Sequence, residues 1–412
     1  MSAREQTGHL PSADPNLPRQ KYLGEKGMVL LLILLSAFIP LSTDIYLPAL
    51  PTMMKVFAVS QYELNMTLVV FFISYGLATL VWGPLSDKYG RRPILFVGIT
   101  MYVVAGGLCA FSANIYMLVL FRILQAIGAG AACAVATAVV KDSYHGKRQE
   151  TVLAITSSMP LISPAIGPLV GAWLLRFTSW RGIFVVQALL GLVILGFVFA
   201  YQETLLSRGQ GSIRQTFARL GFVLAHRRFL YLLLIFNVTS VASMAFISSS
   251  SYIYQEFFGV SSQTYSFYFA FNSLFMIAGP YLYLWAARGF DRVVILRAAF
   301  ALIVVSGALV IVFGRLEPWF FALAMVPTAA MSSLIRPPAT FLLLRQHAGD
   351  AGSASAVMMA FQTMMGTLGI LLVSPGVNMV LLVGALNVVL GLLAGTAWLI
   401  VSRKPVVWVG SD

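Results

Sequence analysis

The amino-acid sequence predicts an all-α membrane protein in which twelve transmembrane helices form two six-helix halves. Three observations support this fold class. First, 59% of the 412 residues are hydrophobic and only 10% are charged, whereas average proteins carry about 25% charged residues. Second, apolar runs near or above ~18 residues recur along the chain, each long enough to cross a ~30 Å hydrocarbon core as a helix. Third, the longest polar stretch between these runs, residues 203–228, falls near the middle.

A soluble protein with buried helices is the alternative class. It is excluded because no soluble core could hide so many helices that are apolar on every side. The first 27 residues are polar and of mixed charge, without the short apolar core and small-residue cleavage site of a signal peptide. We therefore interpret them as a cytoplasmic tail.

The predicted spans follow one another along the chain with short connections. Their expected positions, within a few residues, are 28–51, 62–84, 93–112, 115–140, 151–175, 181–202, 229–254, 263–286, 293–313, 318–344, 353–374 and 377–401. The domains that follow are a cytoplasmic N-terminal tail, 1–27; an N-terminal six-helix bundle, 28–202; a cytoplasmic linker, 203–228; a C-terminal six-helix bundle, 229–402; and a cytoplasmic C-terminal tail, 403–412.

Lysine and arginine set the predicted orientation. With both termini in the cytoplasm, 21 of the 27 Lys and Arg residues lie in cytoplasmic segments, four lie in outer segments, and Arg122 and Arg336 lie within spans. The positive-inside rule therefore predicts cytoplasmic N and C termini. The net charge of +13 is explained by these topology signals beside an anionic lipid leaflet, so we expect a lipid bilayer and no nucleic acid as partner.

The two halves read as a tandem repeat. The first and seventh spans begin 201 residues apart, and the same offset places Arg91 over Arg292 and Ile94-Leu95 over Ile295-Leu296. Parallel six-span halves are a transporter architecture, with the substrate site between them near the middle of the membrane.

The loop between the second and third spans carries the sharpest motif, Gly83-Pro-Leu-Ser-Asp87-Lys-Tyr-Gly90-Arg91-Arg92-Pro93. We expect Gly83 to allow close approach of helix ends, Asp87 to cap a helix or pair with an arginine, and Gly90 to permit a tight turn. Arg91 and Arg92 would anchor the cytoplasmic face. A basic loop that only sets topology is the alternative.

This motif resembles the signature loop of the major facilitator superfamily. The fourth span, Arg122-Ile-Leu-Gln125-Ala126-Ile-Gly-Ala-Gly, is similar to the family's arginine motif, with Ala126 where a glycine is usual. The fifth span reads Gly167-Pro168-Leu-Val-Gly171-Ala, similar to the antiporter motif of proton-coupled exporters, with alanine in place of the last glycine. The resemblance implies that the loop residues and these three span residues act in the conformational switch.

The stretches STDIYLPALP, YIYQEFFGV and AGSASA look like the bicyclomycin/chloramphenicol-resistance (Bcr/CflA) branch of the drug–proton antiporters. The second copy of the loop motif is degraded, with Arg288 where Asp87 would be and Asp291 where Gly90 would be.

Asp44 is the leading candidate for proton coupling. Of the 14 acidic residues it alone lies well inside a predicted span, in the stretch FIPLSTDIYLPALP, and all four histidines fall in predicted cytoplasmic segments. An ionisable residue in a membrane span is costly to insert and is a functional-site hypothesis by default; a structural ion pair is the alternative.

Arg122 is the expected partner of Asp44. Both lie about seven residues, or ~10 Å, below the outer face. A nearby arginine favours the charged carboxylate while desolvation opposes it, so the pair would tune Asp44 to titrate as one side opens. Gln125, one helical turn from Arg122, is expected to hydrogen-bond in the same network.

Substrate-binding candidates come from both halves. They are Tyr46, Phe246, Tyr252, Tyr254, Tyr268, Asn272 and Arg336. Aromatic residues near span ends are as often membrane-interface anchors, and Arg336, which precedes Pro337 and Pro338, has packing or lipid headgroups as alternatives. If Asp44, Arg122 and Arg336 face one chamber, its formal charge is +1 with Asp44 ionised, which favours neutral, zwitterionic or weakly anionic substrates over dications.

The sequence therefore predicts a proton-coupled antiporter that exports small drug-like molecules of the amphenicol, bicyclomycin or multidrug kind. By resemblance it would lie in a bacterial plasma (inner) membrane and function as a monomer, with no enzymatic activity, cofactor or metal. The alternative is a proton-coupled exporter or uptake carrier of a natural metabolite on the same fold. A membrane sensor or enzyme lacks any supporting site, since no P-loop, metal cluster or nucleophile–base pattern is present.

Overall fold

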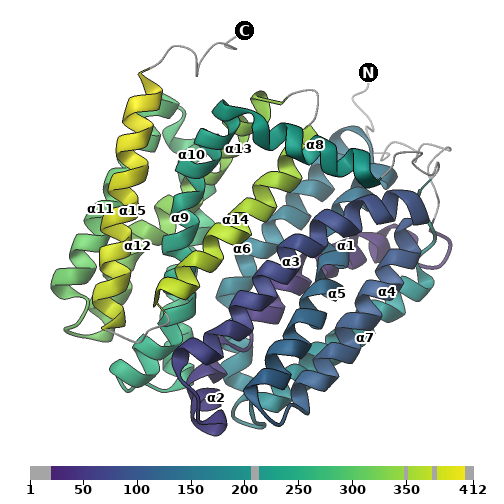
Figure 1. The fold of residues 1–412 in the computed structure, drawn as a ribbon, viewed down its shortest axis with the longest axis horizontal. Helices are drawn as coiled ribbons and strands as arrows, with labels where there is room; N and C mark the ends of the chain where they lie inside the picture. Colours follow the sequence, from purple (N-terminus) through teal and green to yellow (C-terminus); the bar gives the residue numbers. More distant parts are fainter. Residues whose placement is uncertain (1–19, 206–212, 348–350, 374–377, 404–412) are drawn as a thin grey trace, which may run out of the picture.

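The computed structural model describes residues 20–205, 213–347, 351–373 and 378–403 (Figure 1). Within these ranges all the regular structure is helical, and twelve segments are long and apolar enough to cross a membrane. The predicted all-α class with twelve spans is confirmed.

The helices of the first six spans are α1 (Gly24–Asp44), η1 (Leu47–Ala49), α2 (Leu50–Phe57), α3 (Gln61–Tyr89), α4 (Arg91–Ala110), α5 (Ile115–Ser143), α6 (Gly146–Leu174) and α7 (Trp180–Ala200). Helix α8 (Ile213–Ala225) lies in the predicted linker. The last six spans are formed by α9 (Arg227–Tyr252), the π-helical turn η2 (Ile253–Phe257), α10 (Ser262–Ala286), α11 (Arg292–Phe313), α12 (Pro318–Leu334), α13 (Arg336–Arg345), α14 (Ala351–Val373) and α15 (Met379–Ser402).

Two spans are interrupted, and proline explains both breaks. In the first span, Pro48 lacks the N–H that would bond to the carbonyl of Asp44, so α1 ends at that residue. In the tenth, Pro337 and Pro338 follow the turn at Ile335, where α12 gives way to α13. Asp44 and Arg336, the predicted functional residues of these spans, stand directly at the breaks.

Both ends of the described chain lie at one end of the molecule, here called the terminal end, and α2 lies at the opposite, far end (Figure 1). A single hydrophobic core joins the two halves at the far end; it contains Tyr46 and Trp180 from the first half and Tyr252 and Phe321 from the second. The other two cores are separate. One has its buried members within 28–201 and the other within 220–398.

Polar contacts close the far end across the two halves. The Tyr252 hydroxyl donates to Asn65 Oδ1 at 3.3 Å, and the Gln255 side chain donates to the Pro48 carbonyl at 3.1 Å. Between the two ends the halves also touch along α3 and α14 and along α6 and α10. The structure is thus sealed at the far end, whereas the halves keep their own cores toward the terminal end.

Candidate functional site

Asp44 is buried, with 6% of its surface exposed. Its Oδ2 accepts a hydrogen bond from Ser163 Oγ on α6 at 2.9 Å, and its Oδ1 accepts a longer one from Thr43 Oγ1 at 3.5 Å. Helix α6 in turn packs against α10 of the C-terminal half. The predicted intramembrane acid is therefore held by hydroxyl groups at the junction of the two halves.

The glycines of α6 bring that helix against Asp44. A methyl group at Gly167 would come within 2.5 Å of Asp44 Cβ. A methyl group at Gly171 would collide with the backbone carbonyl of Ile45, the residue after Asp44. Glycine is needed for so close an approach. Between them, the Pro168 carbonyl accepts a hydrogen bond from Ser266 Oγ on α10 at 2.8 Å. This segment thus links the surroundings of Asp44 to the C-terminal half.

Arg122 lies fully buried in a box of aromatic rings. Its guanidinium carbon is 4.1 Å from the ring centre of Phe71, 4.8 Å from that of Tyr46 and 5.9 Å from that of Phe184. Its Nε and one terminal nitrogen have no hydrogen-bond partner within the described residues. Cation–π attraction is strongest when the cation is desolvated, as it is here.

A chain of amides connects Arg122 to the end of α1. Arg122 donates to Gln125 Oε1 at 2.8 Å, Gln125 donates to Gln187 Oε1 at 3.1 Å, and Gln187 donates to the Ser42 carbonyl at 3.1 Å. The Ser42 hydroxyl in turn contacts the Tyr102 hydroxyl at 2.5 Å. The expected bond between Arg122 and Gln125 is confirmed. Gln187 was not predicted, although a glutamine in the apolar run FVVQALLG is a signal that sequence reasoning could have used.

The expected ion pair between Asp44 and Arg122 is wrong for this structure. Among the described residues the ion pairs are those of Lys55, Arg91 and Arg148. The physical reason is that each group has other partners: hydroxyls for the acid, and rings and carbonyl oxygens for the base. Arg122 reaches the Ser42 carbonyl at 3.4 Å, two residues before Asp44. The two are joined through the backbone of α1 rather than by direct charge contact.

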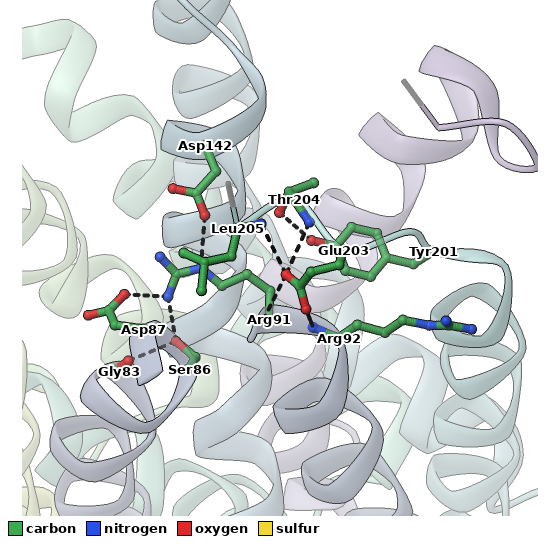
Figure 2. A network of polar contacts seen from close by, with 10 residues as sticks. All are labelled: Gly83, Ser86, Asp87, Arg91, Arg92, Asp142, Tyr201, Glu203, Thr204 and Leu205. Atoms are coloured by element: carbon green, nitrogen blue, oxygen red, sulfur yellow. Dashed lines mark hydrogen bonds and ion pairs between the residues drawn. The ribbon is translucent and has the colours of Figure 1, made fainter. Parts of the chain in front are cut away.

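The loop after α3 forms a polar network centred on Arg91 (Figure 2). The guanidinium contacts Asp87 Oδ1 at 2.5 Å, Ser86 Oγ at 2.6 Å and Asp142 Oδ2, on α5, at 2.8 Å. Its side chain is 6% exposed, whereas that of Asp87 is 58% exposed. The motif thus ties the end of α3 to the end of α5, with Asp87 on the open side.

Glu203, which sequence reasoning did not single out, caps this loop. Its two carboxylate oxygens accept hydrogen bonds from the backbone N–H groups of Arg91 and Arg92, both at 3.0 Å. Negative charge at the first turn of α4 is favoured by the helix dipole. Gly90 precedes this turn with a φ of +108°, and a methyl group there would lie 2.5 Å from Glu203 Oε2. An acid at the first position after the predicted sixth span, 181–202, is the signal that was missed. The Arg92 side chain donates to the Phe199 carbonyl at 2.7 Å.

Close packing at Gly83 is absent from this structure. A methyl group there would meet no atom within 4 Å, and the Gly83 carbonyl accepts a hydrogen bond from Ser86 Oγ at 2.7 Å. The open space beside Gly83 fits the separation of the two cores toward the terminal end.

Most of the predicted substrate-binding residues lie in the sealed far-end core. Phe246 is 3% exposed and Tyr46, Tyr252, Tyr254 and Asn272 are fully buried. Tyr268 is half-buried and stacks on Tyr254 with ring centres 4.9 Å apart. A binding role for these residues stays a prediction for a conformation in which the far end is open.

Arg336 has different surroundings. It lines a cavity of about 110 Å³ in the C-terminal half, bounded by α9, the break between α12 and α13, and α14. Arg336 and Thr340 are exposed to this space. Of the predicted substrate-binding residues, Arg336 is the one on this cavity.

Comparison with known proteins identifies the family. Residues 32–374 match the model of the Major Facilitator Superfamily. An uncharacterised MFS-type transporter of Bacillus subtilis is 28% identical over 370 residues, covering 85% of this chain and 89% of the relative. A chloramphenicol resistance protein of Pseudomonas aeruginosa is 40% identical over 166 residues, covering 40% of this chain and 39% of the relative. A bicyclomycin resistance protein homologue of Haemophilus influenzae is 24% identical over 300 residues, covering 72% and 75%.

Solved structures agree in fold. A bacterial homologue of the human lysosomal transporter Spinster superposes with a TM-score of 0.70 at 16% identity, over 92% of this chain and 97% of the other. A D-xylose–proton symporter gives a TM-score of 0.65 at 13% identity, over 89% and 96%. The predicted resemblance is confirmed: this chain is a multi-pass transporter that belongs to the Major Facilitator Superfamily.

Proposed function

We propose that this transporter exports small drug-like molecules from the cytoplasm in exchange for protons. The relatives named for chloramphenicol and bicyclomycin resistance support the substrate class. The distribution of Lys and Arg supports a cytoplasmic terminal end in a bacterial inner membrane. With that orientation, the sealed far end faces outward and the conformation is inward-facing.

The single observation that carries proton coupling is the position of Asp44. It is a buried carboxyl group, bonded to hydroxyls and free of any ion pair within the described chain, at the boundary between two halves that move relative to each other in this family's architecture. A carboxyl group without a fixed cation changes the local charge by one when it binds a proton. An intramembrane acid of this kind marks proton relays in pumps and transporters.

Proton binding at Asp44 would act on the contact between α6 and the C-terminal half. When Asp44 is ionised, Ser163 donates to it; when it is protonated, the carboxyl can itself donate and one acceptor site is lost. The same helix carries Pro168, whose carbonyl holds Ser266 of α10. Pro168 directly follows Gly167, which packs against Asp44, so a charge change at Asp44 would act beside the bond that joins α6 to the C-terminal half.

The loop network would act as the conformational switch. Arg91 joins α3 to α5, and Glu203 fixes the start of α4, so this end of the N-terminal half moves as one body. In the outward-facing state we expect the exposed carboxylate of Asp87 to meet a helix N-terminus of the other half. The three predicted residues of α6, Gly167, Pro168 and Gly171, would transmit the motion to Asp44.

Transport of a natural metabolite is the second candidate function. A citrate exporter of Aspergillus niger is 32% identical over 189 residues, covering 45% of this chain and 36% of that protein. That relative is named for citrate, a carboxylate, and an arginine lines the cavity described above.

The test is uptake by inverted membrane vesicles under an imposed pH gradient, acid inside. Chloramphenicol and bicyclomycin are compared with citrate and with a dicationic dye, and the fluorescence of a pH probe is recorded in parallel. Antiport predicts substrate accumulation together with proton efflux for the two antibiotics. Accumulation of citrate alone would favour the metabolite carrier, and substrate movement without proton movement would contradict the coupling.

A further inference from the structure

The cavity at Arg336 holds a cation that the described chain does not neutralise. Arg336 lies within the tenth span, 336 being the first residue of α13, and makes no ion pair or side-chain hydrogen bond within the described residues. None of the described residues that line the cavity is acidic. An unpaired guanidinium inside a membrane span is unfavourable unless water or a ligand reaches it.

The rest of the cavity offers hydrogen-bond donors. Ser240 on α9, Thr340 one turn after Arg336, and Gln362 on α14 all line it, and their side chains make no hydrogen bond within the described residues. Asn237 and Ser243 extend the polar face of α9. The side chains of Ser240, Thr340 and Gln362 can each donate to an oxygen atom, whereas Asn237 and Ser243 already donate to backbone carbonyls of α9. Three separate helices therefore present unused donors to one space beside the cation.

Cation, donors and volume together specify a ligand chemistry. A guanidinium binds a carboxylate through two parallel N–H···O bonds, and hydroxyl and amide donors complete the oxygens' remaining sites. A cavity of about 110 Å³ accommodates such a group and a few attached atoms; because whole-ligand pockets measure about 300–1,000 Å³, the rest of a drug-sized molecule would extend beyond it. The apolar side chains at its wall, among them Phe236 and Met358, suit the carbon atoms next to the charged group.

We propose that this cavity binds the carboxylate of those transported molecules that carry one, so that the substrate class extends from neutral drugs to monoanionic amphiphiles. The proposal deepens the proposed function and rests on it for the statement that the ligand is cargo. It also gives proton and anion separate sites, since Asp44 belongs to the first half and Arg336 to the second. The two ligands would then exchange through alternating access rather than by displacing each other from one residue.

Binding is tested on purified protein in nanodiscs of phosphatidylcholine, with no pH gradient. The probes are chloramphenicol hemisuccinate, which is a monoanion at neutral pH, and its methyl ester, which has almost the same size without the charge. The wild type should bind the anion more tightly than the ester. Arg336→Gln should weaken binding of the anion by about tenfold or more while it leaves the ester within about twofold.

Two further variants keep the test decisive. Arg345→Gln removes a cation of the same helix that lies outside the cavity, over the Phe341 ring, and should behave like the wild type. Ser240→Asp places a carboxylate in the cavity and should exclude the anion while Arg336 is intact, which covers the case that Arg336→Gln does not fold.

Three results would overturn the inference: equal affinity of the wild type for anion and ester, an unchanged anion affinity in Arg336→Gln, or an unchanged anion affinity in Ser240→Asp. A phosphate of a lipid headgroup shares the required chemistry. If phosphatidylglycerol added to the nanodiscs abolishes anion binding in the wild type, the cavity is a lipid site and the inference about cargo is wrong. Because none of these measurements uses transport or a pH gradient, failure of proton coupling would leave their outcome unaffected.

Discussion

In each half, a helix that carries glycine packs closely against the first helix of that half. An acid lies at this contact in the first half, whereas the second half has none there. In the first half, Gly167 of α6 meets Asp44 of α1; in the second, Gly369 of α14 meets the backbone of α9 at Val241 and Ala245. Ala245 stands 201 positions after Asp44 and is fully buried in the far-end core. Close helix packing at this place therefore does not require a carboxylate. The comparison teaches that the acid of the first half serves something other than packing.

The loops after the second and eighth spans differ in the same direction. Arg91 contacts two carboxylates, whereas its counterpart Arg292 lies 4.3 Å from the Phe341 ring centre and has a buried Nε without a hydrogen-bond partner in the described chain. Arg288 replaces the acid that would have paired with it. The first half thus holds the charged loop network and the buried acid, and the second half holds the open cation of Arg336.

The largest expected effect comes from neutralising Asp44, the acid at the contact between α1 and α6 that the second half lacks. Asp44→Asn keeps the shape and the bond to Ser163 but cannot bind or release a proton in the relevant pH range. We expect proton-driven accumulation of substrate in inverted vesicles to fall by about 100-fold or more, with unchanged insertion and thermal stability.

Asp291→Asn is the matched control, because Asp291 is an exposed acid at the start of α11 whose side chain makes no cap bond. It should transport like the wild type. If Asp44→Asn vesicles still concentrate substrate when a pH gradient is applied, Asp44 is not the coupling residue.

A second change sharpens the comparison of the loops. Asp87→Asn removes the exposed charge that we expect to stabilise the outward-facing state, so the transport rate should fall by about tenfold while equilibrium substrate binding changes little. Arg288→Gln, at the corresponding place in the second half, should leave both unchanged. A normal transport rate with lost binding in Asp87→Asn would contradict a switch role.

The two repeat-related arginines should differ in stability. Arg91→Gln leaves the Asp142 carboxylate and Ser86 without their charged donor, and we expect it to lower the free energy of unfolding by about 2 kcal/mol. Arg292→Gln removes a ring contact worth about 0.5–1 kcal/mol. Thermal unfolding in detergent measures both losses of stability. Equal losses would show that the carboxylate contacts of Arg91 add no more stability than the ring contact of Arg292.

The sequence was sufficient for the fold because the membrane imposes it. A span must be long, apolar and helical, so the twelve runs and the mid-chain polar stretch left little freedom. Asp44 could be found for the same reason, as the acid in an apolar run. Its partner could not, since depth along two helices says nothing about their rotation: Arg122 turned toward rings and Asp44 toward Ser163. Glu203 and Gln187 were missed because each acts across a contact between helices distant in the chain.

The last comparison concerns two buried amides that stand 200 residues apart, Gln187 on α7 and Asn387 on α15. Gln187 bonds to Gln125 and to the Ser42 carbonyl, whereas the Asn387 side chain donates to the Met325 sulfur at 3.6 Å and its oxygen has no partner within the described residues. Gln187→Leu leaves the Gln125 amide without its acceptor and the Ser42 carbonyl with only the longer bond from Arg122, so it should cost about 1–3 kcal/mol of stability.

The same change should shift the pH profile of transport, because it loosens the link between Arg122 and the end of α1. Asn387→Leu removes an amide whose oxygen was never satisfied, so its cost should be close to zero and the pH profile should stay as in the wild type. Thermal unfolding and transport rate against pH are measured for both variants. If the two amides prove interchangeable in both measurements, the Gln187 network is ordinary packing and the contrast between the halves reduces to Asp44 and the Arg91 loop.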